Sequence, residues 1–546
     1  MPCDWNPGNR RVFWEVFVLK KIATATALTL LLAAAARAET PRDGGTIRYT
    51  APYGSSFANL DILTSNRAQD EIYAKALHRS LYNWDAFGKK LVLELAKSVS
   101  VSEDGLVYTY KLRDDAYFHN GRRMTADDII WTYNHLMDGS KAYPGARDVR
   151  IIKGAVAVEK GQAKEISGLK KIDDFTFEMT LTERLEPGYY FYDAITSIYP
   201  ASEATKPEFA NHPIGLGPYK LTEYVPGSRL VAERWEKFYK PGKPHAQRIV
   251  ISLVGEASAR DVAFRNKEID VSILGPAQYV AYKQDAELSK GLLEVAEVYT
   301  RAMGMNPTFK PFSDPRVRQA INYAIDTDLI IKRLARDKAY RATGWLPLSS
   351  AAYDSSLKPY AYDPEKAKKL LAEAGYPDGF EFEWTATSNE SWGIPIVEAV
   401  IPMLAKVGIK AKIKPVEGTV LSELVRSGDY QAFIWSLQTG PDPLATLKCF
   451  HSATPQSACN YMHYKNPKVD ALLDEAAATG DQAKRIDLLK KVNAIIYDDA
   501  PVWFFNYNKA VMAYQPWLKG LQPNANELAV QNYEDMWVDT SSPAAN

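Results

Sequence analysis

The sequence predicts a mixed α/β fold with more than one domain. Strand-like segments of alternating apolar and polar residues and helix-like segments with recognisable caps follow each other in irregular order. The chain has 546 residues, and at roughly 100–200 residues per domain this length predicts two or three domains. The sequence contains no internal repeat and no low-complexity linker, so we expect chain crossings within the fold to join the domains.

The strands and turns are predicted from period-2 alternation and from turn residues. The first strand is expected to begin at Thr46, and a helix with apolar residues at helical spacing follows over 69–81. Leu106 to Leu112 alternate apolar and polar side chains, which is typical of a half-buried strand. Asn120-Gly121 predicts a tight turn, because both residue types tolerate a positive φ. Further along the chain the same signals predict a strand over 219–223, a helix over 262–270 and a strand over 270–274.

Capping residues mark the starts of four helices. Thr125 stands three residues before Asp128, which is the spacing of a capping box. Ser313, Asp363 and Asn466 are the other expected N-caps, and a proline at the first helical position follows the last two.

Residues 1–38 have the pattern of a signal peptide and are kept out of the fold. Lys20-Lys21 precede an apolar run over 22–36, which is shorter than the about 20 residues that span a bilayer. Ala36-Arg37-Ala38 resembles a cleavage site, and the mixed stretch before Lys20 indicates an over-long start. No cysteine stands directly after the apolar run, at the cleavage site, so we expect an exported, periplasmic protein without a lipid anchor.

Charge and motifs argue against nucleic-acid binding and against catalysis. Basic and acidic residues both number 66, so no large basic surface is implied and we expect no nucleic-acid partner. The chain contains no HExxH, no G-x-S-x-G and no phosphate-binding loop. His119 lies beside a turn and is interpreted as structural. We therefore expect no enzyme activity and no cofactor.

Cys449 and Cys459 are the two cysteines outside the leader, and we expect them to form a disulfide in an oxidising compartment. A metal site with His451 and His463 is the alternative. Its spacing, C-x-H-x7-C-x3-H, matches no common zinc pattern, so we expect no metal.

The segment 104–128, read as DGLVYTYKLRDDAYFHNGRRMTADD, resembles the solute-binding proteins of the dipeptide, oligopeptide and nickel ABC importers, which form family 5 of the extracellular solute-binding proteins. Four more blocks resemble this family in the right order, at 44–61, 217–227, 301–326 and 461–475. The resemblance implies a two-lobed periplasmic-binding-protein (clam-shell) fold of the cluster C type, with an extra inserted domain. Its implied domains are domain I (39–85, 213–300 and 515–546), domain II (86–212) and domain III, the second lobe (301–514).

By the same resemblance the protein is a monomer that captures its ligand between the lobes, closes about a hinge and contacts an inner-membrane permease transiently. Its ligand is expected beside the segment 433–443, where an aromatic-rich strand is predicted to end at Trp435 before a Gly/Pro-rich loop. The expected contacts there are Trp435, Gln438, Thr439 and Asp442. Peptide-binding relatives carry an Asp at the position of Gln438, which pairs with the ligand's amino group. Asp442 either replaces that anchor or caps the following helix.

A second departure from the family's pattern concerns the residues that bind the ligand's carboxylate. Dipeptide binders place an Arg and a Tyr in the loop after the strand that is expected over 380–384, and Thr387 and Asn389 stand there in this chain. A neutral amide does not replace a charge-assisted bond of ~1.5–3 kcal/mol. Trp392 nearby either stacks on a ligand or packs in the core, and Tyr53 and Phe57 after the first strand are further candidates for stacking on a ligand.

Three functions remain open from the sequence. The first is capture of a peptide or peptide-like solute that is longer, blocked or modified. The second is the same role with non-peptide cargo, such as an oligosaccharide or an opine-like sugar conjugate, because amides, hydroxyls and an aromatic face suit a neutral polyol. The third is a periplasmic enzyme or a sensor.

Overall fold

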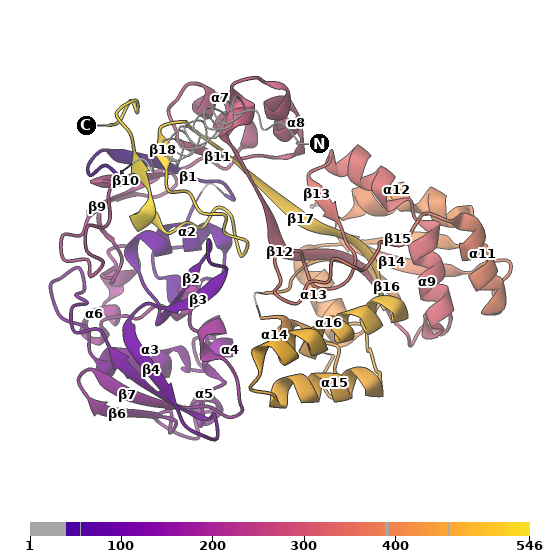
Figure 1. The fold of residues 1–546 in the computed structure, drawn as a ribbon, viewed down its shortest axis with the longest axis horizontal. Coiled ribbons are helices and arrows are strands. Elements are labelled where there is room, and N and C mark those ends of the chain that lie inside the picture. Colours follow the sequence, from indigo (N-terminus) through magenta and orange to yellow (C-terminus); the bar gives the residue numbers. More distant parts are fainter. Residues whose placement is uncertain (1–39, 55, 388–392, 441, 457, 546) are drawn as a thin grey trace, which may run out of the picture. The chain divides into compact units, whose positions relative to one another are not determined.

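A computed structural model describes residues 40–54, 56–387, 393–440, 442–456 and 458–545, with the side chains of Thr419 and Gln438 left out. The leader expected over 1–38 lies outside these ranges. Residues 43–546 form one compact unit, and its element order is drawn in Figure 1. Strands and helices are mixed along the whole unit, so the predicted α/β class is confirmed.

The N-terminal part of this unit contains two four-stranded sheets and a hairpin. The first sheet has the order β1-β10-β9-β8, in which β1 pairs with β10 in parallel; its strands are Thr46–Ala51, Arg248–Leu253, Arg229–Arg234 and Tyr219–Val225. The second is antiparallel with the order β4-β5-β7-β6; its strands are Ala96–Val101, Val107–Leu112, Thr176–Thr180 and Leu169–Asp173. The hairpin pairs β2 (Tyr82–Asp85) with β3 (Lys90–Leu93).

The helices of this part are short. They are α2 (Ala68–Leu77), α3 (Ala126–Leu136), α4 (Ala146–Val149), α5 (Ala155–Glu159), α6 (Ala201–Ala204), α7 (Ala257–Arg265) and α8 (Pro276–Gln284). Helix α3 begins where the capping box was expected, and the Asp128 carboxylate accepts a hydrogen bond from the Thr125 N–H over 2.9 Å.

The turn before α3 is a three-residue hairpin loop. The Gly121 N–H donates to the Phe118 carbonyl, and Gly121 has a φ of +84°. The Phe118 N–H donates to the Arg122 carbonyl, and Tyr117 bridges to Arg123. This is a turn followed by one left-handed residue, so Gly121 alone, and not Asn120 with it, takes the positive φ.

The C-terminal part is built on a larger sheet, with seven strands among the described residues and the order β11-β17-β12-β16-β14-β15; β13 pairs with β17. In that order the strands are Val271–Ile273, Val502–Tyr514, Leu292–Met305, Ala432–Gln438, Glu381–Thr387 and Lys410–Val416, with β13 at Ala339–Arg341. Its helices are α9 (Pro315–Ala324), α10 (Thr327–Ile330), α11 (Pro364–Glu373), α12 (Ile394–Ala405), α13 (Gly418–Ser427), α14 (Pro443–Lys448), α15 (Pro467–Ala478) and α16 (Gln482–Asp499). A small ribbon pairs β18 (Leu518–Lys519) with β19 (Trp537–Val538).

Two long strands connect the main hydrophobic cores, and Figure 1 shows β12 and β17 side by side. Val295 of β12 and Met512 of β17 belong to the core that is formed mainly by residues 47–253 and 510–538. Met303 of β12 and Trp503 of β17 belong to the core of the C-terminal part. The pairing of β12 with β17 shifts register between Ala296 and Thr300, so the ladder is irregular between the two cores.

Several element boundaries differ from those expected. Helix α2 ends at Leu77, four residues before the expected end. Asp314, not Ser313, caps α9, because Asp314 accepts from the Arg316 N–H while the Ser313 hydroxyl donates back to the Lys310 carbonyl. Strand β14 ends at Thr387 rather than at residue 384, and β16 continues past Trp435 to Gln438. Helix α7 begins at Ala257 and ends at Arg265, so both of its bounds lie five residues before those expected. Within the described ranges, no helix combines the length and apolar character needed to cross a membrane.

Candidate functional site

A charged cavity of about 140 Å³, here called cavity A, collects residues from distant parts of the chain. Its walls come from α2, β2, α4, the segment 192–195, β12 and the segment 524–532. The lining residues are Asn66, Ala68, Glu71, Lys75, Asn83, Trp84, Arg147, Tyr192, Asp193, Ala194, Ile195, Tyr299, Asn524, Asn526, Glu527, Val530 and Asn532. Carboxylates, cations, amides and aromatic rings thus face one small volume.

A second cavity of about 240 Å³, cavity B, shares Ala68, Tyr299 and Glu527 with cavity A. The shared residues make the two cavities neighbours. Cavity B adds one residue that follows β1, two of β12, one of β16 and one of β17, which are Tyr53, Glu297, Arg301, Ser436 and Asn508. The two cavities are therefore treated as one candidate site.

Helix α2 contributes a carboxylate and a cation to cavity A from the same face, because Glu71 and Lys75 are one turn apart. Burial raises the pKa of Glu71 well above its ordinary value, and the negative charges of Asp193 and Glu527 raise it further. Burial also lowers the pKa of Lys75. Both groups are thus held in surroundings that disfavour their charged forms, as is common in binding sites.

Two further carboxyl groups, Glu297 and Glu527, line cavity B. Glu297 accepts from the Leu528 N–H over 2.8 Å and from the Asn508 amide over 2.5 Å. Glu527 accepts from the Tyr53 hydroxyl over 2.6 Å. Burial raises the pKa of Glu297 to about 8, and the neighbouring Glu527 contributes to the shift. The two acids therefore do not both ionise readily without a nearby cation.

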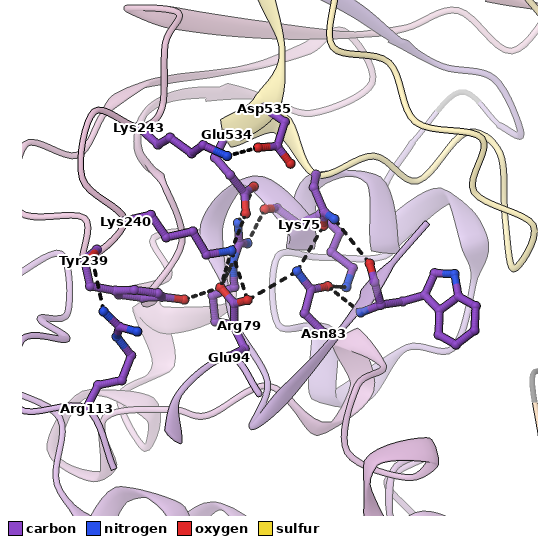
Figure 2. A network of polar contacts seen from close by, with 12 residues as sticks. Lys75, Arg79, Asn83, Glu94, Arg113, Tyr239, Lys240, Lys243, Glu534 and Asp535 are labelled. Atoms are coloured by element: carbon purple, nitrogen blue, oxygen red, sulfur yellow. Dashed lines mark hydrogen bonds and ion pairs between the residues drawn. The ribbon is translucent and has the colours of Figure 1, made fainter. Parts of the chain in front are cut away.

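A buried ion cluster is connected to cavity A through Asn83, and Figure 2 shows the cluster in close-up. The Arg79 guanidinium contacts Glu534 over 2.7 Å and Glu94 over 3.3 Å, and the Lys240 ammonium lies 2.8 Å from each of the same two carboxylates. Tyr239 also donates its hydroxyl to Glu94. Burial opposes ionisation, but Arg79 and Lys240 hold the pKa of Glu534 below its ordinary value. Two cations thus balance two carboxylates in this cluster.

Asn83 connects the ion cluster to the cavity wall. Its amide nitrogen donates to Glu94 over 3.4 Å and to Asn532 over 3.3 Å. Its carbonyl oxygen accepts from the Lys75 ammonium over 3.3 Å and from the Trp84 N–H over 2.9 Å. The cluster therefore fixes the orientation of lining groups on α2, β2 and the C-terminal segment (Figure 2).

Trp435, Thr439 and Asp442, which were expected to contact the ligand, are not among the residues that line cavity A or cavity B. Trp435 is half-buried and packs against Tyr461, with 5.6 Å between ring centroids. The buried Thr439 donates its hydroxyl to the Val298 carbonyl over 2.7 Å. Asp442 caps α14 by accepting from the Leu444 N–H over 2.9 Å, which is the second of its two expected roles. The side chain of Gln438 lies outside the description.

The other expected residues are divided between core, cavity and segments that are not described. Thr387 is buried at the end of β14. Asn389 and Trp392 fall outside the described residues. Tyr53 lines cavity B. Phe57 is a core residue that packs against Tyr73 with 4.9 Å between ring centroids, so its ring is not presented to a ligand.

Two structural expectations are confirmed. Cys449 and Cys459 form a disulfide with 5.1 Å between their Cα atoms. His119 is buried, its Nε2 lies 3.0 Å from the Gly217 carbonyl, and its Nδ1 accepts from the Gly215 N–H over 3.3 Å. Burial lowers the pKa of His119 to about 4, so the imidazole stays neutral and joins two loops.

Comparison with known proteins identifies the class. The family model of bacterial extracellular solute-binding proteins, family 5 (middle), matches residues 90–458. A glutathione-binding protein GsiB from Escherichia coli O1:K1 is 31% identical over 485 residues, which span 86% of this chain and 90% of that protein. The chain belongs to family 5 of the bacterial extracellular solute-binding proteins, and it is the substrate-binding component of an ABC importer.

Solved structures agree on the fold. HbpA2 from Haemophilus parasuis has a TM-score of 0.79 and 24% identity, over 90% of this chain and all (100%) of that one. A periplasmic binding protein DppA from Helicobacter pylori, in complex with the peptide STSA, has a TM-score of 0.72 and 24% identity, over 92% of this chain and 99% of that one. The expected two-lobed periplasmic-binding-protein fold is thereby confirmed.

Proposed function

We propose that this protein captures a short peptide or peptide-like solute in cavities A and B and delivers it to an inner-membrane permease. The relative with 31% identity is a glutathione-binding protein, so a small peptide-like ligand is the first candidate. We further propose that the protein acts as a monomer, contacts its permease transiently, and neither transforms its ligand nor needs a cofactor.

The observation that carries this proposal is the mixture of charges in cavity A. Glu71, Asp193 and Glu527 face the same volume as Lys75 and Arg147. A zwitterionic peptide carries both an ammonium and a carboxylate group, and each would find groups of opposite charge there. A neutral sugar carries no charge that could pair with these groups. Its binding would bury charges without partners, which costs free energy and weakens the complex.

The remaining expectations belong to the same proposal. Residues 1–38 act as a signal peptide that is removed on export to the periplasm, and the mature protein carries no lipid anchor. The proposed boundaries of domains I, II and III are those given in the sequence analysis. Binding of the ligand makes the two lobes close, with β12 and β17 as the hinge. Gln438, Asn389 and Trp392 are proposed to contact the part of the ligand that extends away from cavity A.

A binding screen on the mature protein tests the cargo class. Glutathione, di-, tri- and tetrapeptides, neutral oligosaccharides and opine-like sugar conjugates are compared by thermal shift and then by calorimetry. A ligand at 100-fold above its dissociation constant stabilises the protein by ~2.7 kcal/mol, which such a screen detects. We expect shifts with peptide-like solutes. Shifts with oligosaccharides alone would contradict the proposal, and turnover of any ligand would indicate an enzyme.

A further inference from the structure

Cavity A contains an amide that no protein group satisfies. Asn526 lines the cavity and is only 8% exposed. Its Oδ1 and its Nδ2 are both buried, and neither has a hydrogen-bond partner among the described residues. Buried amide groups in folded proteins nearly always have partners, so an amide without one at a cavity wall is free to bond to a ligand group.

The Glu71 carboxylate is the second group of cavity A that lacks a hydrogen-bond partner within the described part of the chain. Of the residues that the structure describes, none donates a hydrogen bond to its carboxylate. The charges of Lys75 and Arg147 partly offset that of Glu71, but the Lys75 ammonium donates to the Asn83 amide over 3.3 Å and the Arg147 guanidinium donates to Asp148 over 3.3 Å. Burial, followed by the charges of Asp193 and Glu527, raises the pKa of Glu71. A cation placed beside Glu71 would relieve this shift.

Aromatic rings add to the preference for a cation. Trp84 and Tyr192 both line cavity A, with their ring centroids 6.4 Å apart. Tyr299 is the third aromatic residue of the lining. The faces of such rings attract ammonium and guanidinium groups.

We propose that cavity A binds the primary ammonium group of the ligand, with Glu71 and Glu527 as its charged partners and the Asn526 carbonyl as its neutral acceptor. An ammonium group has three donors, and these three residues supply three acceptors. The inference rests on the proposed function and deepens it, because it assigns the amino end of the ligand to α2 and the C-terminal segment. The charged anchor that is missing at Gln438 is thus replaced from elsewhere in the chain.

The test compares ligands that differ only in this group. Peptides that bind the mature protein are measured by calorimetry against their N-acetylated forms, and glucosamine is measured against N-acetylglucosamine. We expect acetylation to weaken binding at least 30-fold. Glu71→Gln should weaken the free amine by a similar factor and leave the weak binding of the acetylated form unchanged. Glu365→Gln, an exposed acid of α11, is the matched control and should change neither.

Two more variants keep the result interpretable if Glu71→Gln disturbs the fold. Asn526→Asp adds a carboxylate of the same shape and should retain or tighten amine binding, whereas Asn526→Leu should weaken it. Thermal melting checks that each variant is folded.

The outcomes separate this inference from the proposed function. If glucosamine binds in a Glu71-dependent way and no peptide binds, the cargo class is wrong and the ammonium site stands. If peptides bind but acetylated and free forms bind equally, or Glu71→Gln affects both equally, the ammonium site is wrong. If no amine-bearing solute binds, both are overturned.

Discussion

The Arg79 guanidinium donates to the Glu534 carboxylate over 2.7 Å although 455 residues separate them in the chain. Both side chains are almost completely buried. The pair joins the end of α2 to the C-terminal segment, and these two regions supply most of the charged groups of cavity A. The stability of the protein and the geometry of its candidate site are therefore linked through one ion cluster.

The first prediction concerns this pair. Glu534→Gln removes one of two carboxylates that face Arg79 and Lys240, which leaves a buried cation with too little compensation. We expect a loss of about 3–5 kcal/mol in the free energy of unfolding, the usual cost of breaking a buried ion pair from one side. Urea denaturation measures it as a lower midpoint with an unchanged slope. Glu365→Gln on the surface is the control, and an equal midpoint in the two variants would contradict the prediction.

The second prediction concerns Glu297. Burial and the charge of Glu527 raise its pKa from 4.5 to about 8, although hydrogen bonds from Leu528 and Asn508 and the charge of Lys338 act to lower it. Between these two values the folded protein keeps a proton that the unfolded chain has released. Folding stability therefore falls as the pH rises through this range. Glu297→Gln stays neutral and should flatten the dependence, so its melting temperature should exceed that of the wild type more at about pH 8 than at about pH 5.

Thermal unfolding at the two pH values measures this difference, and we expect at least about 3 °C at the higher pH. Parallel curves for Glu297→Gln and the wild type would show that Glu297 is ionised throughout the range.

The third prediction concerns the disulfide. Labelling of the unreduced, denatured mature protein should detect no free thiol, because Cys449 and Cys459 are joined. The closed loop is short, so replacing both residues with Ser should lower the free energy of unfolding by ~2–3 kcal/mol. A melt in the presence of a reductant should lower the wild type to the same value. A labelled thiol in the unreduced protein would contradict the pairing.

The fourth prediction concerns Gly215. A Cβ at this position would lie 1.9 Å from the Leu77 carbonyl oxygen, which is backbone at the end of α2. Gly215→Ala should therefore cost about 2 kcal/mol or more, because the backbone must move to relieve the overlap. Gly480→Ala is the matched control, since a Cβ there meets nothing within 4 Å. Equal melting temperatures for the two variants would be inconsistent with the close approach.

Local features of the fold were predictable from the sequence because they depend on neighbouring residues. Asp363 and Asn466 cap α11 and α15 as expected, since a cap needs only the next three residues. The error at Ser313 has the same origin. Ser313 and Asp314 are both good capping residues, and the proline at 315 selects Asp314 because it occupies the first helical position.

The candidate site was not predictable in the same way. Residues of α2 and of the segment 524–532 line cavity A together, and no local sequence pattern in either segment predicts that they meet. Among the expected ligand contacts whose side chains the structure describes, Tyr53 is the one that lines cavity B. A signal was nevertheless present at Glu297, because an acid in the largely apolar strand LLEVAEVYTRAMGM is unusual unless it has partners or a function.

The irregular pairing of β12 with β17 has a mechanical consequence. Glu297 and Tyr299 lie inside the interval in which the ladder shifts register, and both line cavity B. The Val298 N–H between them donates to the Ala525 carbonyl, and its own carbonyl accepts from Thr439. The part of β12 that lines cavity B is thus also a part in which its pairing with β17 is interrupted. A solute bound in cavity B would contact β12 where its pairing with β17 is irregular. Ligand binding would therefore restrain the same few peptide groups on which rotation of the two lobes depends.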